Sequence, residues 1–181
     1  MPKTPDAVLD DMVRTEAGWW LAQHRPVIGW DLDSTLCSTV HRRDMVPAIK
    51  AGGPDAPTWC DYSLQCADDE PVHGSVALMR EMGWYTHIAV SGRSLLAYDL
   101  TWEWVKKHQV PLSAVILRPS EDHSPNGIWK TRVLQALRRN GADVRLYFED
   151  WKESAEQIRC ETGIPVIGIN PFDGEVPGTG L

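Results

Sequence analysis

Short apolar runs alternate with stretches of helical periodicity along most of the chain, most clearly beyond residue 70. The segment YTHIAVSG (85–92) is rich in β-branched residues and ends at a glycine, a pattern typical of a strand. In the next segment, 94–109, apolar side chains recur at helical spacing behind a serine suited to cap a helix. The same criteria predict strands ending at Trp30 and over 112–118, 143–150 and 164–170, and helices over 6–23, 127–141 and 151–162.

Strands that alternate with helices form right-handed βαβ units, in which helices cover both faces of a mostly parallel sheet. We therefore expect an α/β, Rossmann-like fold. The length of 181 residues favours a single domain over 1–181, with its core at about 24–37 and 72–170.

Residues 38–71 break this alternation. They contain AGGPDAPTWCDY and CADDEP, which are rich in Gly, Pro and Asp and weakly periodic. This composition predicts a long loop or small cap inserted after the first strand. Trp59 and Tyr62 in this insertion are suited to stack on a nucleobase, although packing of a cap against the sheet would explain them as easily.

Polar side chains fall at the predicted carboxyl ends of three strands. They are Asp31 and Asp33, then Ser91, then Glu149 and Asp150. In open α/β sheets, ligands bind beyond the carboxyl ends of the strands. We therefore expect these distant residues to gather at one edge, although Asp31 and Asp33 taken alone would be explained by a turn.

Two neighbouring acids at such an edge suit phosphoryl chemistry. One carboxylate can attack phosphorus to form an aspartyl-phosphate, and a second acid can move the proton that the reaction requires. Phosphate and carboxylates repel each other, so Mg²⁺ held by carboxylate oxygens is the expected cofactor. Lys130 would add a fixed positive charge, while Ser91 and the amides of its turn, including that of Gly92, would donate to phosphate oxygens.

The sequence resembles the haloacid dehalogenase (HAD) superfamily of phosphotransferases. DLDST (31–35), VSGRS (90–94), a lysine at position 130 and YFED (147–150) resemble that superfamily's four motifs in their order. The resemblance spans about residues 27–170. Ser34 departs from it, since glycine is most frequent at that position of the superfamily, although other residues occur there in working members.

The resemblance implies a role for each matching residue. Asp31 is the expected nucleophile, Asp33 the general acid/base, Ser91 the phosphate-binding hydroxyl and Lys130 the cation that steadies nucleophile and phosphate. The expected metal-binding groups are Asp31, the backbone carbonyl of Asp33, Glu149 and Asp150, with Asp150 favoured over its neighbour.

Within the superfamily, the sequence is similar to the phosphatase half of polynucleotide kinase–phosphatases and to stand-alone phage relatives. The similar segments are SGRS, WEWVKKHQVPLSAVILRP and EDHSPNGIWK. These enzymes remove phosphate from the 3′ end of nucleic acid or from a nucleoside 3′-phosphate. Arg42 and Arg93 then match arginines that assist phosphate or substrate binding, although Arg42 could equally pair with acids in the CADDE run (66–70). No GxxxxGK[ST] segment accompanies these motifs, so no kinase half is expected.

Composition narrows the class of partner. The net charge of −7 argues against a broad basic surface that grips nucleic acid and favours small nucleotides or short ends. The four cysteines show no paired pattern, and Cys60, Cys66 and His73 lack the close spacing of a structural zinc site. No segment is typical of a signal peptide or membrane span, so we expect a cytoplasmic protein with no membrane partner.

These features together predict a Mg²⁺-dependent phosphomonoesterase that acts through a phospho-Asp31 intermediate. The expected partner is a phosphorylated small molecule or nucleic-acid end, with nucleotides and 3′-phosphate ends preferred. Two alternatives stay open: a HAD phosphatase or phosphotransferase for another phosphorylated metabolite, and a non-catalytic phosphate-binding module.

Overall fold

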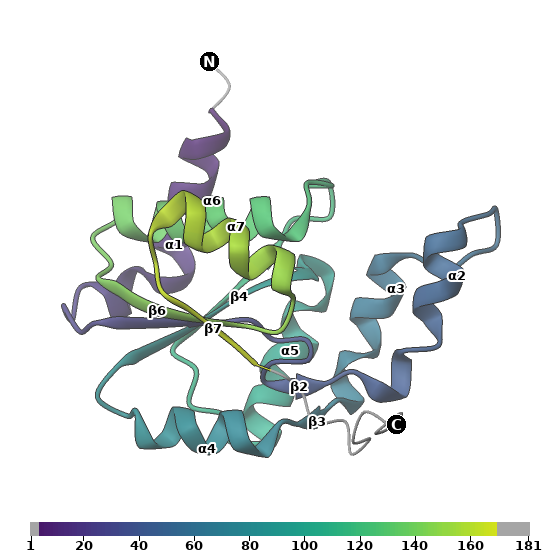
Figure 1. Ribbon diagram of the computed structural model, residues 1–181, viewed down its shortest axis with the longest axis horizontal. Helices are drawn as coiled ribbons and strands as arrows, with labels where there is room; N and C mark the ends of the chain where they lie inside the picture. Colours follow the sequence, from purple (N-terminus) through teal and green to yellow (C-terminus); the bar gives the residue numbers. More distant parts are fainter. Residues whose placement is uncertain (1–3, 170–181) are drawn as a thin grey trace, which may run out of the picture.

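The computed structural model describes residues 4–169, in which a five-stranded parallel sheet forms the centre of the molecule (Figure 1). The strand order β5–β4–β1–β6–β7 places the first strand in the middle. The strands are β1 (Val27–Trp30), β4 (Thr86–Ser94), β5 (Ala114–Arg118), β6 (Val144–Glu149) and β7 (Val166–Gly168). This order confirms the predicted Rossmann-like α/β fold with a parallel sheet.

Helices cover both faces of the sheet, and each face has its own apolar core. One core joins α1, α6 and α7 to the sheet, and the other joins α4 and α5 to the opposite face (Figure 1). The helices are α1 (Pro5–Leu21), α4 (His73–Glu81), α5 (Tyr98–Lys107), α6 (Asn126–Arg139) and α7 (Lys152–Thr162). Among the described residues, no helix combines the length and apolarity that a membrane span requires.

Most predicted helices agree with the structure to within two residues at each end, but one begins later than predicted and another was missed. The helix expected from residue 94 begins at Tyr98, because Leu95–Ala97 first form a 3₁₀ turn that the Ser94 hydroxyl caps by accepting from the Leu96 amide. The helix α4 was not predicted at all. Val72 at its N-cap makes no side-chain capping bond, so the usual sequence marker of a helix start is missing there.

The insertion has more regular structure than its composition suggests. Its two ends pair as a short antiparallel ribbon, β2 (Cys37–Ser38) with β3 (Glu70–Pro71). Between them lie η1 (Val40–Arg42), α2 (Met45–Ala51), α3 (Trp59–Leu64) and η2 (Gln65–Asp68). The helices α2 and α3 project to one side of the α/β core (Figure 1), and no residue of α2 is buried.

His87 in β4 is a buried residue that can titrate, so it links the stability of the core to pH. Its Nδ1 accepts from the Trp30 indole at 3.1 Å, so the ring proton lies on Nε2, which donates to the Met82 carbonyl at 3.1 Å. Burial lowers the pKa of His87 below its usual 6.5. The imidazole of the unfolded chain therefore takes up a second ring proton at a higher pH than the folded protein does. The free energy of unfolding should fall as pH decreases from 6.5 toward the lowered folded pKa. The slope is at most about 1.4 kcal/mol per pH unit.

Urea unfolding at a series of pH values would measure this slope. The variant His87→Gln, which cannot titrate, should have a flatter pH dependence than the unmodified protein over this window. The matched control is His123→Gln, since His123 is exposed in a loop. Equal slopes for the unmodified protein and His87→Gln would show that His87 does not couple folding to pH.

Candidate active site

Asp31 lies directly after β1, at the carboxyl edge of the sheet. Its amide donates to the Phe148 carbonyl of β6 at 2.9 Å, which fixes the start of the turn, and its residue surface is only 5% exposed. One carboxylate oxygen, Oδ2, lies 2.9 Å from the Lys130 ammonium. The other, Oδ1, is buried and has no hydrogen-bond partner. A buried carboxylate oxygen without a partner is costly unless the site serves a ligand.

The turn after Asp31 explains why glycine suits position 34. Ser34 has φ +64°, a left-handed conformation that costs residues with a Cβ roughly 1–2 kcal/mol. Its amide donates to the Cys37 carbonyl at 2.7 Å, and its hydroxyl lies 3.2 Å from that of Thr39. These bonds partly offset the strain, so the serine is accommodated without opening the turn.

Lys130 enters the same site from α6. The side chain is buried, and its ammonium contacts Glu149 Oε2 at 2.6 Å as well as Asp31. Burial by itself would lower the lysine pKa, but the charges of Asp31 and Glu149 outweigh it, so the pKa is raised. Lys130 is therefore a fixed cation and not a surface lysine.

Glu149 ends β6, and Asp150 follows it. One carboxylate oxygen from each, with one from Asp31, lies within 4.8 Å of the others. Burial, and then the charge of Asp31, raises the pKa of both Glu149 and Asp150, against the opposing effect of Lys130. Three acids share one ammonium, so the cluster lacks positive charge. Together with the unpartnered Asp31 oxygen, this all-oxygen set fits Mg²⁺, which binds few carboxylates and retains water ligands.

Ser91 and Gly92 lie near the carboxyl end of β4, beside β1 in the sheet. Ser91 is buried, and its hydroxyl accepts from the Arg93 amide at 3.3 Å. At Gly92 a Cβ would approach Asn126 Oδ1 to 2.3 Å, so a larger residue would displace the side chain of Asn126 at the start of α6. The predicted phosphate-binding turn thus neighbours the acids but also has a packing role.

Arg42 and Arg93 form a second cluster with Asp33 and with Asp69, a residue that the motifs did not single out. Arg42 contacts Asp69 through Nε at 2.8 Å and Nη2 at 2.6 Å, and contacts Asp33 at 2.7 Å. Arg93 also donates to Asp33, and to Asp69 at 3.0 Å. Arg42 therefore pairs with an acid of the CADDE run, as the alternative prediction had it, while also contacting Asp33.

The arginines determine the charge state of Asp33. Burial would raise the pKa of this carboxyl, but Arg93 and Arg42 lower it well below its usual range. The Asp33 side chain keeps 25% of its surface exposed, unlike that of Asp69, which has none. Asp33 is thus ionised in the absence of substrate, and it is the carboxylate of this cluster that solvent can reach.

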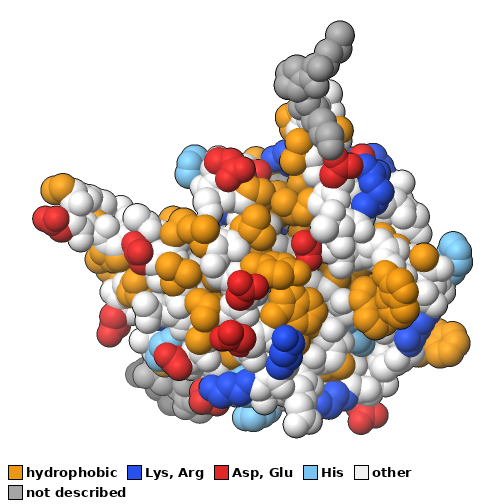
Figure 2. Space-filling model, turned by 180° about the vertical axis from the view of Figure 1, so that it is seen from behind, with side chains coloured by type: hydrophobic (Ala, Val, Ile, Leu, Met, Phe, Trp, Pro, Cys, Tyr) orange, Lys and Arg blue, Asp and Glu red, His pale blue; other side chains and the backbone are white. Residues whose placement is uncertain are grey.

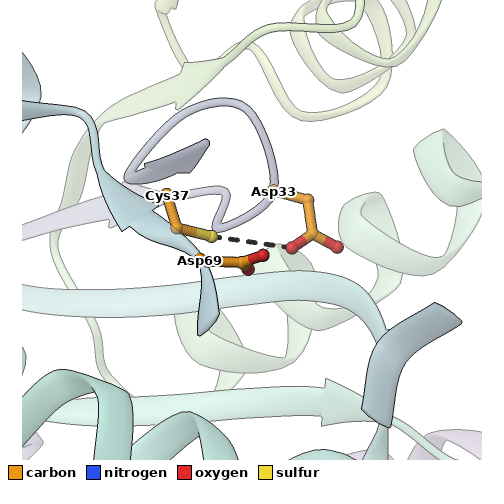
Figure 3. Close-up of side chains that lie close together, drawn as sticks. All are labelled: Asp33, Cys37 and Asp69. Carbon is orange, nitrogen blue, oxygen red and sulfur yellow. Dashed lines mark hydrogen bonds between the residues drawn. The ribbon is translucent and has the colours of Figure 1, made fainter. Parts of the chain in front are cut away.

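Figure 3 shows Asp33 and Asp69 pointing toward Cys37, a geometry that could hold a metal ion. The guanidinium of Arg93 donates to all three groups, at 3.1 Å to the Cys37 sulfur. Burial also raises the pKa of the Cys37 thiol well above its usual value, so the thiol stays protonated. Arginine already neutralises this cluster, and we do not assign a metal to it.

Other sequence candidates are not brought together. Within the described residues, no potential metal cluster contains Cys60, Cys66 or His73. The ring of Tyr62 is buried over the Arg42 guanidinium, with 4.2 Å between ring centroid and Cζ, so it is closed to a base. Trp59 is 50% exposed, which leaves only this member of the pair open to stacking.

No family model and no curated protein matches this chain. Solved structures do. The chain is similar to one in the Pnkp1/Rnl/Hen1 RNA repair complex (TM-score 0.63, 18% identity), covering 83% of this chain but only 44% of that one. It is also similar to the class C acid phosphatase of Bacillus anthracis with tungstate bound (TM-score 0.56, 16% identity, 91% and 75% covered). A haloacid dehalogenase-like family hydrolase of Streptococcus pneumoniae also matches (TM-score 0.56, 14% identity, 82% and 86% covered).

The chain therefore spans less than half of the repair-complex chain that it matches, whereas it covers most of the Streptococcus hydrolase. At these identities the similarity concerns the fold. The chain, with its parallel sheet and the four motif segments at one edge of that sheet, has the fold of the HAD-like hydrolases.

Proposed function

We propose that this protein is a Mg²⁺-dependent phosphomonoesterase that forms an aspartyl-phosphate, an acyl phosphate, on Asp31. The observation that carries the proposal is the state of the Asp31 carboxylate. Lys130 holds one oxygen at 2.9 Å, while the other is buried without a partner at the edge of a HAD-like sheet. A carboxylate fixed in this way is oriented for attack on phosphorus.

The reaction has two steps. First, an Asp31 oxygen bonds to phosphorus as the bond to the leaving oxygen breaks, and that oxygen receives a proton from Asp33. Second, water attacks the phosphorus, the bond to Asp31 breaks, and the ionised Asp33 accepts the proton of the water. Mg²⁺ held by Asp31, the Asp33 carbonyl, Asp150 and Glu149 would neutralise charge on the phosphoryl group.

The two roles of Asp33 place different demands on its arginines. The ionised carboxylate that Arg42 and Arg93 stabilise suits the second step directly. The first step requires Asp33 to carry a proton, so its arginine contacts must weaken when substrate arrives. A phosphate group is a natural competitor for both guanidiniums. Ser91 and the Gly92 amide are proposed to donate to the phosphoryl oxygens.

The proposed substrates are nucleotides or the 3′-phosphate ends of nucleic acid. The SGRS turn and the pair Arg42 and Arg93 support this choice, as does the similarity to a chain of an RNA repair complex. The net charge of −7 supports short substrates over long polymers. On the face shown in Figure 2, basic side chains lie in small groups separated by acidic and apolar ones.

A substrate panel tests this proposal. It compares nucleoside 3′- and 5′-monophosphates, 3′-phosphorylated oligonucleotides, sugar phosphates and an aryl phosphate, each with Mg²⁺. Preference for the nucleotides or oligonucleotides is expected. Preference for sugar phosphates would favour the alternative, a metabolite phosphatase like the acid phosphatases among the structural matches. Failure to hydrolyse any phosphate monoester would leave a phosphate-binding module as the better description.

Chelation is expected to stop turnover. The three acids of the proposed Mg²⁺ site have one ammonium beside them, so without the metal their negative charge would repel a phosphate group. Millimolar Mg²⁺ should also raise the melting temperature by several degrees, since a ligand that binds the folded state stabilises it. Asp150→Asn should reduce this shift, whereas Asp68→Asn, at an exposed acid, should not. A shift that is unchanged in Asp150→Asn would exclude Asp150 as a ligand.

A further inference from the structure

Asp69 is the residue of the site for which neither the motifs nor the proposed mechanism provides a role. It follows η2 near the C-terminal end of the insertion, and its side chain is completely buried. Its backbone is held on both sides: the amide donates to the Cys66 carbonyl at 3.2 Å, and the carbonyl accepts from the Trp104 indole at 2.6 Å. A buried carboxylate whose backbone is fixed in this way is suited to orient the cationic side chains that it binds.

The Asp69 carboxylate holds two guanidiniums that come from different parts of the chain. It binds Arg42 of the insertion with both oxygens, at 2.8 and 2.6 Å, and binds Arg93 of β4 at 3.0 Å. Both guanidiniums also donate to one further carboxylate atom, Oδ1 of Asp33. Their other contacts are neutral: Arg42 donates to the Tyr62 carbonyl, and Arg93 donates to the Thr101 hydroxyl and the Cys37 sulfur. Two buried guanidiniums thus share two carboxylates. The carboxylate of Asp69 is closed to solvent, and that of Asp33 is partly exposed.

We propose that Asp69 is a positioning residue for proton transfer to the leaving group. This inference rests on the proposed phosphatase activity. Asp69 neutralises part of the charge of Arg42 and Arg93 and sets their orientation, so that neither holds Asp33 too strongly to release it. Without Asp69, both guanidiniums have Asp33 as their one remaining carboxylate in the cluster. Asp33 then stays bound to them and cannot protonate the departing oxygen.

Leaving-group dependence separates this role from a purely structural one. An alkoxide, as released from a nucleoside monophosphate, needs a proton to leave, whereas nitrophenolate leaves as a stable anion. Loss of acid catalysis therefore slows hydrolysis of the alkyl ester far more than that of p-nitrophenyl phosphate. Loss of folding or of the nucleophile slows both by the same factor.

The experiment measures kcat and KM of Asp69→Asn with both esters, beside Asp33→Asn and the matched control Asp68→Asn. Asp69→Asn and Asp33→Asn should each lose about tenfold or more additional kcat/KM, which reports the step that releases the leaving group, on the alkyl ester relative to the aryl ester. The control should match the unmodified protein on both. Circular dichroism and the melting temperature report whether each variant folds.

Trp104→Phe is a second variant for the case in which Asp69→Asn does not fold. It removes the indole hydrogen bond to the Asp69 carbonyl and should shift the ratio of the two rates in the same direction, by a smaller factor. Equal losses on both esters, or no loss, in the folded variants would overturn the role of Asp69. An unmodified protein that hydrolyses neither ester would instead contradict the proposed phosphatase function itself.

Discussion

Asp31→Asn is expected to lower the turnover of phosphate monoesters by at least about a thousandfold, because an amide cannot replace a carboxylate as nucleophile. The substitution preserves the size of a side chain that is almost fully buried. It also leaves Lys130 paired with Glu149 at 2.6 Å, so the cation is not left alone. The loss should therefore arise from chemistry and not from unfolding.

Two measurements check this expectation. Phosphate release gives the loss of rate, and acid quenching after incubation with labelled substrate traps any covalent phosphoenzyme. The unmodified protein should carry label, and Asp31→Asn should carry none. Asp55→Asn, at an exposed acid of the insertion, is a matched control that should retain both activity and label. Activity that survives Asp31→Asn would refute the covalent mechanism.

Lys130→Met should have the second largest effect, because it removes the one ammonium that contacts Asp31 and Glu149 in the described structure. Methionine fills a similar volume, but two buried carboxylates lose their partner. Removing one member of a buried ion pair typically costs about 3–5 kcal/mol of folding stability. The rate should also fall by about a hundredfold or more, since Asp31 loses the contact that orients it.

Chemical denaturation with a chelator present would measure the stability loss of Lys130→Met. Added Mg²⁺ should make the loss smaller, because a bound cation can neutralise the same carboxylates. Lys152→Met, whose side chain is 82% exposed on α7, should change neither stability nor rate appreciably. A Lys130→Met protein with unchanged stability and rate would show that the buried ammonium does not hold the acids.

Sequence patterns predicted the centre of the fold well because its strands are simple. β1 is buried along its whole length, and β4 along most of its length, so both appear as apolar runs that end in polar turns. The motif positions followed from this, since parallel strands present their carboxyl ends at one edge. That reasoning predicted that Asp31, Glu149 and Asp150 lie close together, as they do. Lys130 lies on a helix, so its place beside these acids was expected from the resemblance and not from the strand ends.

The insertion could not be predicted to the same extent. α2 buries no residue and has Pro47 within its first turn, so it lacks the apolar face that periodicity detects. For α3 a marker was present: Thr58 and Asp61 form a capping box, which the sequence shows as a threonine followed three residues later by an acid.

Asp69 illustrates a further limit of the sequence. It stands in a run of three acids, Asp68, Asp69 and Glu70, of which only the middle one is buried. Its partner Arg42 is 27 positions earlier in the chain. Local patterns do not specify such a pairing, because it depends on how the two ends of the insertion return to the sheet.

The closure of the insertion at its base has a consequence for how this protein can diversify. The β2–β3 ribbon and the contact of Arg42 with Asp69 tie the two ends together next to the sheet. Residues 44–57, which include α2 and contain no buried residue, can therefore be shortened, lengthened or exchanged with little effect on the acid cluster. Grafting other segments at these positions would therefore change the insertion while Arg42, Asp69 and the acids at the edge of the sheet stay in place.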